Sequence, residues 1–193
     1  MPHPIDLDTM MPQIRAARAS FPDRHRGVTI ETPGPGQRSV WDFPRPPAVE
    51  AVPLRCTVDF AGRRVADSGA VLRVCETAGA PVYYFPAADV AEDALMPLDK
   101  LTLCEWKGTA AYFDLVVDGR RAPAAVFTLD QPLPDLGQGY ERLVGRYAFY
   151  PGSVDACHVG PDPVTPQPGG YYAGWVTPDL TGPIKGGPGS AGW

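Results

Sequence analysis

The stretch "TAAYFDLVVDGRRAPAAVFTL", residues 109–129, decides the fold class of this chain. It contains two runs rich in apolar, β-branched and aromatic residues, and the dipeptide Asp118-Gly119 joins them. Such residues favour strands, and Asp-Gly is a strong signal for the tight turn of a β-hairpin. The stretch therefore predicts two antiparallel strands, one on each side of the turn.

Further strands are predicted on both sides of this hairpin. "LRCTVDFAG" (54–62) alternates apolar and polar residues, and "RRVADS" (63–68) returns as its partner. Four more runs have strand character: "AVLRVCET" (70–77), "APVYYFP" (80–86), "KLTLCEW" (100–106) and "RYAFYPG" (146–152). Between them, "AADVAEDAL" (87–95) predicts one short helix, with Asp89 capping its start and Pro97 ending it. We expect a mainly β, compact antiparallel domain with one short helix.

Proline and glycine divide the chain into three parts. They are sparse between Leu54 and Leu129, whereas residues 161–193 contain seven prolines and eight glycines. At 193 residues the chain is long enough for one ordinary core domain. We predict an N-terminal extension over 1–37, with a short helix in 10–19 and an extended arm after it. The core β domain follows over 38–155, and a tail over 156–193 packs its aromatic residues partly on the core.

Net charge and hydropathy indicate which classes of partner and which cellular location to expect. The net charge of −5 lacks the basic footprint of a nucleic-acid-binding protein. No run approaches the length of a membrane span, and the N-terminus has no apolar block of the signal-peptide kind. We therefore expect a cytoplasmic protein that binds neither nucleic acid nor membrane, with a small-molecule ligand or substrate and a homodimer as its possible partners.

The sequence gives little support for a metal site, a nucleophilic cysteine or a phosphate-binding loop. The cysteines (Cys56, Cys75, Cys104, Cys157) and histidines (His3, His25, His158) form no CxxC, CxxH or HxxxH pair that would favour zinc. The histidines lie outside the predicted core, so a cysteine–histidine couple is disfavoured and the thiols are interpreted as packing residues. Neither GxxxxGK[ST] nor GxGxxG occurs. We expect no metal and no cofactor.

What remains is a set of charged and aromatic residues at predicted strand ends. Glu76 closes one apolar strand, and Lys107 follows Trp106 at the end of another. In an antiparallel sheet such ends can meet on one rim, where Glu76 and Lys107 could serve as acid and base. The alternative is a structural ion pair at the sheet edge, and the sequence does not decide between the two.

Four motifs also carry a resemblance to a known family: "SVWDFPRPP" (39–47), "VADS" (65–68), "VCETAGAPVYYFPAADV" (74–90) and "CEWKGTAAYFDL" (104–115). Together they resemble the bacterial and fungal family known as domain of unknown function 427, over about 38–193. The resemblance implies a β-tent-like fold in which sheets pack around a pocket. It also brings the label of nucleotidyltransferase, which we discount because the chain has neither a phosphate loop nor a paired-aspartate metal motif.

By motif match, the resemblance implies nine site residues. Glu76 and Lys107 are the proposed catalytic pair, and the proposed ligand-binding residues are Trp41, Asp42, Arg45, Tyr84, Asp89, Trp106 and Tyr112. The chain departs from the family at Cys75, where members usually have leucine, and at Ala125–Thr128, where they often have an aromatic-rich "AW.Y" strand. The absence of that tryptophan and tyrosine predicts a pocket of different shape.

Two functions compete on this evidence. The first is an enzyme without metal, in which Glu76 and Lys107 act as acid and base in a pocket at the strand ends. The second is a non-catalytic ligand-binding or oligomeric accessory module in which the same residues are structural. The sequence does not indicate a substrate or a pathway.

Overall fold

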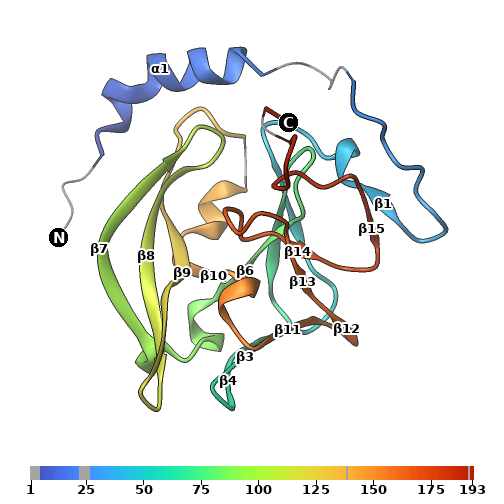
Figure 1. The fold of residues 1–193 in the computed structure, drawn as a ribbon. Helices are drawn as coiled ribbons and strands as arrows, with labels where there is room; N and C mark the ends of the chain where they lie inside the picture. The colour runs from blue at the N-terminus through green and yellow to red at the C-terminus, as the bar shows by residue number, and fades with distance from the viewer. Residues whose placement is uncertain (1–4, 22–26, 138, 191) are drawn as a thin grey trace.

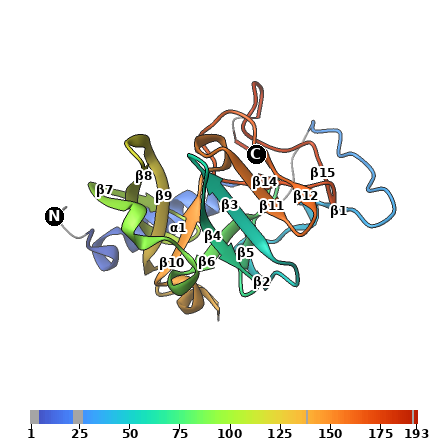
Figure 2. The ribbon, with the colours of Figure 1, turned by 90° about the horizontal axis from the view of Figure 1, so that it is seen from below.

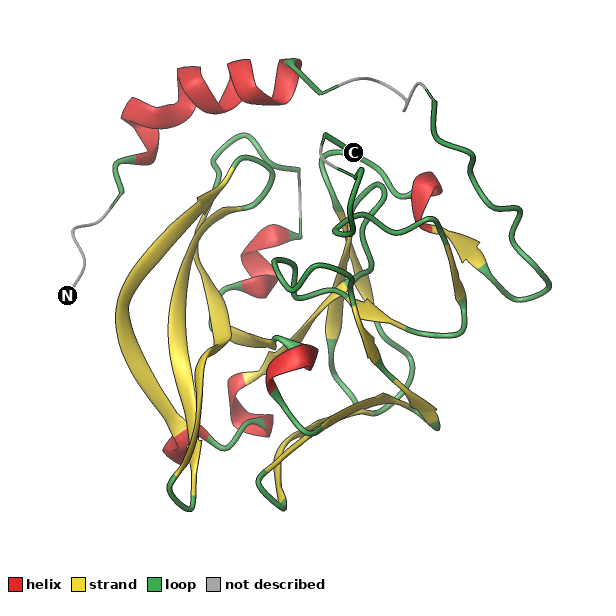
Figure 3. Cartoon of the chain, viewed as in Figure 1, coloured by secondary structure: helices red, strands yellow, loops and turns green. Residues whose placement is uncertain are grey.

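The computed structural model describes residues 5–21, 27–137, 139–190 and 192–193. As the sequence predicts, the fold is mainly β: two larger antiparallel sheets form its body, and the described residues contain one α-helix (Figure 1 and Figure 3). Two small two-stranded sheets are built from the segments nearer the ends of the chain.

The larger sheet has seven strands in the order β2-β5-β6-β10-β9-β8-β7, and all neighbours are antiparallel. Their bounds are β2 (Ala48–Ala51), β5 (Leu72–Cys75), β6 (Val82–Pro86), β7 (Leu95–Cys104), β8 (Gly108–Val117), β9 (Arg120–Pro132) and β10 (Arg146–Phe149). The predicted hairpin is confirmed as β8 and β9. Its turn places Asp118 at φ 47° and Gly119 at φ 80°, which are left-handed conformations that Asp and Gly tolerate well.

A four-stranded sheet packs against one face of the larger sheet. Its order is β12-β11-β3-β4, with bounds β3 (Cys56–Phe60), β4 (Arg63–Ser68), β11 (Ala156–Val159) and β12 (Asp162–Pro163). The predicted alternation is confirmed in β3, where Cys56, Val58 and Phe60 are buried and the residues between them are half-buried. The main core lies between the two sheets.

Strand β6 shows how the larger sheet serves two cores. Tyr83 and Phe85 point into the main core, whereas Tyr84 belongs to a second apolar cluster with Tyr112 and Phe127. Successive side chains of a strand point to opposite faces, so an unbroken aromatic run fills both sides. The second cluster covers the face that carries the cavity described below.

The segments beyond the larger sheets also join the fold. β1 (Arg38–Ser39) pairs in parallel with β15 (Leu180–Thr181), and β13 (Thr165–Pro166) pairs with β14 (Trp175–Val176). The side chain of Trp175 is fully buried in the main core, where it stacks on Tyr83 with ring centroids 4.8 Å apart. Short 3₁₀ turns occur in several connections of the described chain, among them η1 (Val40–Asp42), η4 (Tyr140–Leu143) and η5 (Pro151–Ser153).

Three details of the predicted elements are wrong. The helix expected over 87–95 is two 3₁₀ turns, η2 (Ala87–Asp89) and η3 (Glu92–Ala94), and neither has a side-chain cap. Asp89 is the last residue of η2, and its carboxylate accepts a hydrogen bond from Ser68 Oγ at 2.5 Å. Pro97 lies inside β7, an edge strand, at a register shift where its missing N–H is tolerated.

The N-terminal helix α1 (Leu7–Ala19) begins one turn earlier than predicted. Asp6 caps it by accepting a hydrogen bond from the backbone N–H of Thr9. Met11 and Ile14 are buried on one side and pack against Leu133, which follows β9. The helix thus lies across one end of the larger sheet (Figure 1 and Figure 2). No helix among the described residues is long and apolar enough to span a membrane.

Candidate functional site

Glu76 lies at the centre of a cluster of positive charges. Its Oε2 atom is 3.0 Å from Lys107 Nζ, and its Oε1 atom is 2.7 Å from Lys185 Nζ. A third cation, Arg45, has its Nη2 atom 3.9 Å from Oε1. We call these four residues the Glu76 cluster.

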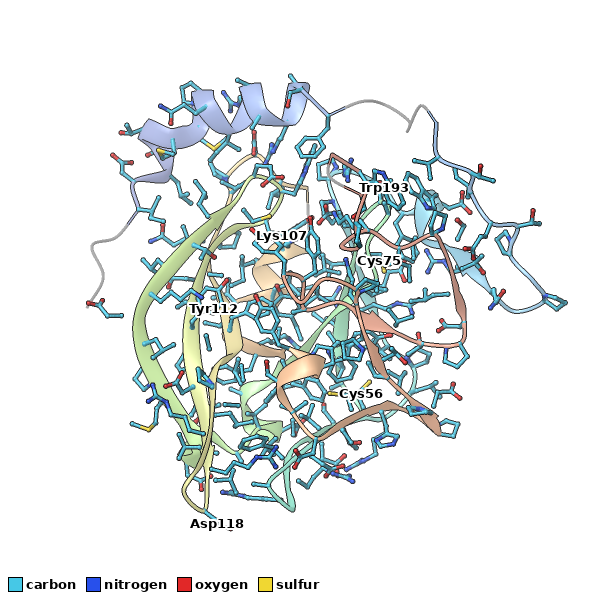
Figure 4. All side chains as sticks on the ribbon, in the orientation of Figure 1. Cys56, Cys75, Lys107, Tyr112, Asp118 and Trp193 are labelled. Atoms are coloured by element: carbon cyan, nitrogen blue, oxygen red, sulfur yellow. The ribbon has the colours of Figure 1, made fainter. Side chains whose placement is uncertain are left out.

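Four separate segments bring the cluster together. Glu76 directly follows β5, Lys107 lies in the turn between β7 and β8, and Lys185 follows β15. Arg45 comes from the segment between η1 and β2. In Figure 4, Lys107 and Asp118 lie at opposite ends of β8, and Lys107 is at the same end of the molecule as Cys75 and Trp193.

Gly108 fixes the backbone beside Lys107. Its φ of 130° is in the region that favours glycine, and a Cβ atom there would lie 2.0 Å from the carbonyl oxygen of Gln131. The Lys107 carbonyl accepts a hydrogen bond from the Leu133 N–H at 3.1 Å. The β7–β8 turn is therefore pressed against the end of β9, and this contact positions the lysine.

Lys185 is positioned by hydrogen bonds from its own backbone. Its N–H donates to the carbonyl of Ala78 at 2.8 Å, and its carbonyl accepts from Gln167 Nε2 at 3.0 Å. Gln167 is itself buried and accepts a hydrogen bond from the N–H of Ala80. The tail segment is thus attached to the loop between β5 and β6, one end of which is Glu76.

The cluster is largely shielded from water, which strengthens its electrostatics. The side chains of Glu76, Lys107 and Lys185 are 16%, 19% and 6% exposed. Burial by itself raises the pKa of Glu76, but the charges of Lys107 and Lys185 outweigh it and lower that pKa to about 2. Burial by itself lowers the pKa of Lys107, but the neighbouring Cys104, Glu76 and Tyr84 groups raise it well above its usual value. Glu76 and Lys107 are therefore both charged at neutral pH.

A cavity of about 570 Å³ lies beside the cluster. Strands β6, β7, β8 and β9 line one side of it, and the tail segment around Tyr172 lines another. Its aromatic wall includes Tyr84, Tyr112, Phe127, Tyr150, Tyr171, Tyr172 and Trp193. Of the Glu76 cluster, Glu76, Lys107 and Lys185 line the cavity, and Arg45 does not.

The predicted site residues divide into two groups. Glu76, Lys107, Tyr84 and Tyr112 line the cavity together, and the hydroxyl of Tyr112 is 3.0 Å from Thr102 Oγ1. Trp41, Asp42, Arg45, Asp89 and Trp106 do not line it.

Trp41 and Arg45 contact the end of the tail from outside the cavity. The Trp41 ring lies 5.4 Å from the Trp193 ring, and its Nε1 donates to the Pro183 carbonyl at 2.8 Å. Arg45 Nη2 donates to the Trp193 carbonyl at 3.0 Å. Asp42 is exposed at the end of η1. These contacts order the tail that supplies Lys185.

Trp106 is buried between two arginines next to the cavity. The guanidinium carbons of Arg18 and Arg45 lie 5.4 Å and 5.9 Å from its ring centroid, and Phe21 packs edge-on at 5.6 Å. Its indole N–H finds no acceptor among the described residues. Trp106 therefore connects α1 to the segment that bears Arg45.

The cysteines and histidines form no reactive couple in the described chain. Burial raises the pKa of the Cys56 and Cys75 thiols to about 12, as expected for packing residues. His158 lies on β11, opposite Thr57 of β3, while His3 and His25 are outside the described residues. Within those residues, no group of three or more His, Cys, Asp or Glu side chains could bind a metal ion.

Residues 48–160 match the model of the family described as domain of unknown function 427. The match covers more than half of the chain. The chain belongs to this family. No curated protein matches the sequence. The matched residues 48–160 contain Glu76, Tyr84, Lys107 and Tyr112. The match begins after Arg45 and ends before Lys185, so two members of the Glu76 cluster lie outside it.

Lys185 is the member of the Glu76 cluster that sequence reasoning missed. It lies in "GPIKGG", within a segment interpreted only as a biased tail. One signal could have drawn attention to it: the chain has only three lysines, and this one is the only charged side chain in the proline- and glycine-rich residues 180–193.

Proposed function

We propose that the cavity binds a small molecule and that Glu76, Lys107 and Lys185 form its polar wall. The observation that supports this most strongly is the cavity itself, whose volume of about 570 Å³ lies beside a charged and largely buried cluster. Ligand sites usually enclose roughly 300–1,000 Å³ and combine aromatic walls with a few convergent polar groups. The cavity has both features.

The charge states favour binding over acid–base catalysis. A general acid or base works best when its pKa lies near the operating pH. The two lysines lower the pKa of Glu76 to about 2, and the pKa of Lys107 is raised, so neither group exchanges a proton readily near neutrality. The non-catalytic binding module is therefore the better supported of the two hypotheses. A catalytic role would require both pKa values to move toward neutrality when a substrate enters.

Retention of a metabolite by the protein tests this function. The protein is dialysed against a small-molecule extract, and mass spectrometry identifies any compound that it concentrates. Ala110→Trp fills the cavity from β8, whereas Ala51→Trp adds the same side chain at an exposed site on β2. We expect the wild type and Ala51→Trp to retain the same compound, and Ala110→Trp to lose it.

The fate of the retained compound separates binding from catalysis. After long incubation the binding function predicts a compound of unchanged mass. Equal retention by folded Ala110→Trp would overturn the cavity as the site. Conversion of the compound at a rate that Lys107→Met abolishes, while thermal stability stays normal, would instead establish the enzyme hypothesis.

A further inference from the structure

We propose that the ligand of this cavity is an aromatic oxyanion, that is, an aromatic ring that carries a carboxylate or phosphate group. This inference rests on the proposed binding function and names the class of ligand. Three features of the described residues support it: the charge balance of the Glu76 cluster, the placement of the lysines, and the position of the tyrosines.

The Glu76 cluster has an excess of positive charge. One carboxylate faces the cations of Lys107 and Lys185 in direct contact and that of Arg45 at 3.9 Å. Glu105 is the only other carboxylate side chain among the lining residues described, and Lys100 adds one more cation. Positive charge that is shielded from water without a matching anion is costly. An oxyanion in the cavity would offset this excess.

The lysines also keep unused hydrogen-bond donors. An ammonium group has three N–H donors, and Lys107 and Lys185 each use one of them on Glu76. Within the part of the chain that the structure describes, Lys100 forms no ion pair, and its ammonium lies over the Tyr112 ring, 4.0 Å from the centroid. A carboxylate or phosphate has several acceptor oxygens that could occupy such donors.

Lysine and arginine are used in different places. All three lysines of the chain line the cavity, whereas none of the arginines described does. Many arginines instead form ion pairs on the outer surface, as Arg63 does with Asp93 and Arg64 does with Asp59. Most of the described arginines are therefore matched by carboxylates, whereas three lysines and only two carboxylate side chains line the cavity.

The tyrosines at the cavity indicate that the ligand contains an aromatic ring. Tyr171 and Tyr172 form an edge-to-face pair at the cavity, with ring centroids 4.9 Å apart, and the residue Tyr171 is 78% exposed. Tyr84, Tyr112 and Phe127 also line the cavity and belong to one apolar cluster. Large exposed apolar patches mark binding sites more often than single exposed residues do, and aromatic rings bind one another by offset or edge-on stacking. A planar aromatic ring in the cavity could stack on such side chains.

Calorimetry with three matched probes tests the inference on the full-length protein. The probes are 2-naphthoate, its neutral analogue 2-naphthamide, and decahydronaphthalene-2-carboxylate, which keeps the charge but lacks the aromatic ring. We expect 2-naphthoate to bind about tenfold more tightly than each of the other two, which corresponds to about 1.4 kcal/mol. Phenyl phosphate and benzoate, compared in the same way, distinguish a phosphate from a carboxylate source.

Variants show whether the lysines cause the preference for an anion. Lys185→Met and Lys100→Met should each reduce the preference for naphthoate over naphthamide to about threefold or less. Lys100 is exposed, so its variant is expected to fold even where Lys185→Met does not. Arg63→Met removes a cation outside the cavity and should leave the preference unchanged.

Each contrary result has a separate meaning. Equal affinity for naphthoate and naphthamide would overturn the anionic ligand, and equal affinity for naphthoate and its saturated analogue would overturn the aromatic one. Failure of all the probes to bind would overturn the inference as a whole. The binding function would still stand if the dialysis experiment retained a neutral or aliphatic compound in a cavity-dependent way.

Discussion

Glu76 is ionised in the folded protein at pH values where a free glutamate would be protonated. The two lysines lower its pKa from the usual 4.5 to about 2 despite the opposing effect of burial. Because the pKa is lower in the folded than in the unfolded chain, the ionised carboxylate stabilises the fold above about pH 5. This contribution is lost progressively as the pH falls through 4 toward 2.

The variant Glu76→Gln tests this contribution at the scale of one residue. At pH 7 it should reduce the free energy of unfolding by about 1–3 kcal/mol, because it leaves Lys107 and Lys185 shielded without their carboxylate. The difference from the wild type should shrink as the pH falls from 5 to 2. Urea unfolding at pH 7, 4 and 3 measures it. Glu31→Gln, at an exposed position, serves as the control. A difference independent of pH would contradict the assignment.

At the scale of the element, the β7–β8 hairpin depends on the close approach of its turn to β9. Gly108 pairs with both Cys104 and Pro132, so the backbones of three strands meet there. A side chain at this position would collide with the carbonyl of Gln131. The lysine that faces the cavity is therefore positioned by a neighbour that has no side chain.

Two glycine variants distinguish the cost of the backbone collision at Gly108 from the cost of an unfavourable φ angle alone. Gly108→Ala should destabilise the protein by more than about 3 kcal/mol, because it adds a backbone collision to an unfavourable φ. Gly119→Ala, at φ 80° in the β8–β9 turn, meets nothing within 4 Å and should cost only about 1–2 kcal/mol. Chemical denaturation gives both values. Equal losses would show that the close approach at Gly108 is not what limits substitution.

At the scale of the whole molecule, the segment after β12 closes one side of the cavity and is anchored in the core by Trp175. The indole is fully buried, donates a hydrogen bond to the Phe149 carbonyl at 3.1 Å and stacks on Tyr83. The same segment presents Tyr171 and Lys185 at the cavity. The interior and the candidate site therefore depend on one stretch of chain.

Two aromatic variants of this segment should differ sharply in stability. Trp175→Ala should lower the free energy of unfolding by about 3–5 kcal/mol, because it leaves a large void in the core. Tyr171→Ala, which removes a mostly exposed ring four residues away, should change it by no more than about 0.5 kcal/mol. Thermal and urea unfolding measure both variants. A small effect of Trp175→Ala would mean that the segment does not contribute to the core.

The elements that the sequence predicted well are those governed by local chemistry. Three features depend only on neighbouring residues: the Asp118-Gly119 turn, the alternation in β3 and the aromatic run of β6. Each can therefore be recognised from the pattern of a short stretch of sequence. The prediction was wrong at 87–95. There, short-range helical preference was overridden by pairing with β4, in which Val90 bridges Ala66 and the Ala91 N–H donates to the Val65 carbonyl at 2.8 Å, and this pairing separates the two 3₁₀ turns.

By itself, the sequence determined the mainly β class and the central hairpin, and it marked Glu76 and Lys107 as candidate site residues. Only the tertiary structure decided which groups surround them. Glu76 meets Lys107 across 31 positions and Lys185 across 109, whereas Asp89 bonds to Ser68 instead. No local pattern encodes such contacts, because they arise where separate loops and a glycine-rich tail pack together. The physical reason is that the pattern of a strand depends on residues that are close together in the sequence. The net charge of a cavity depends on residues that are far apart in the sequence and meet only in the folded chain.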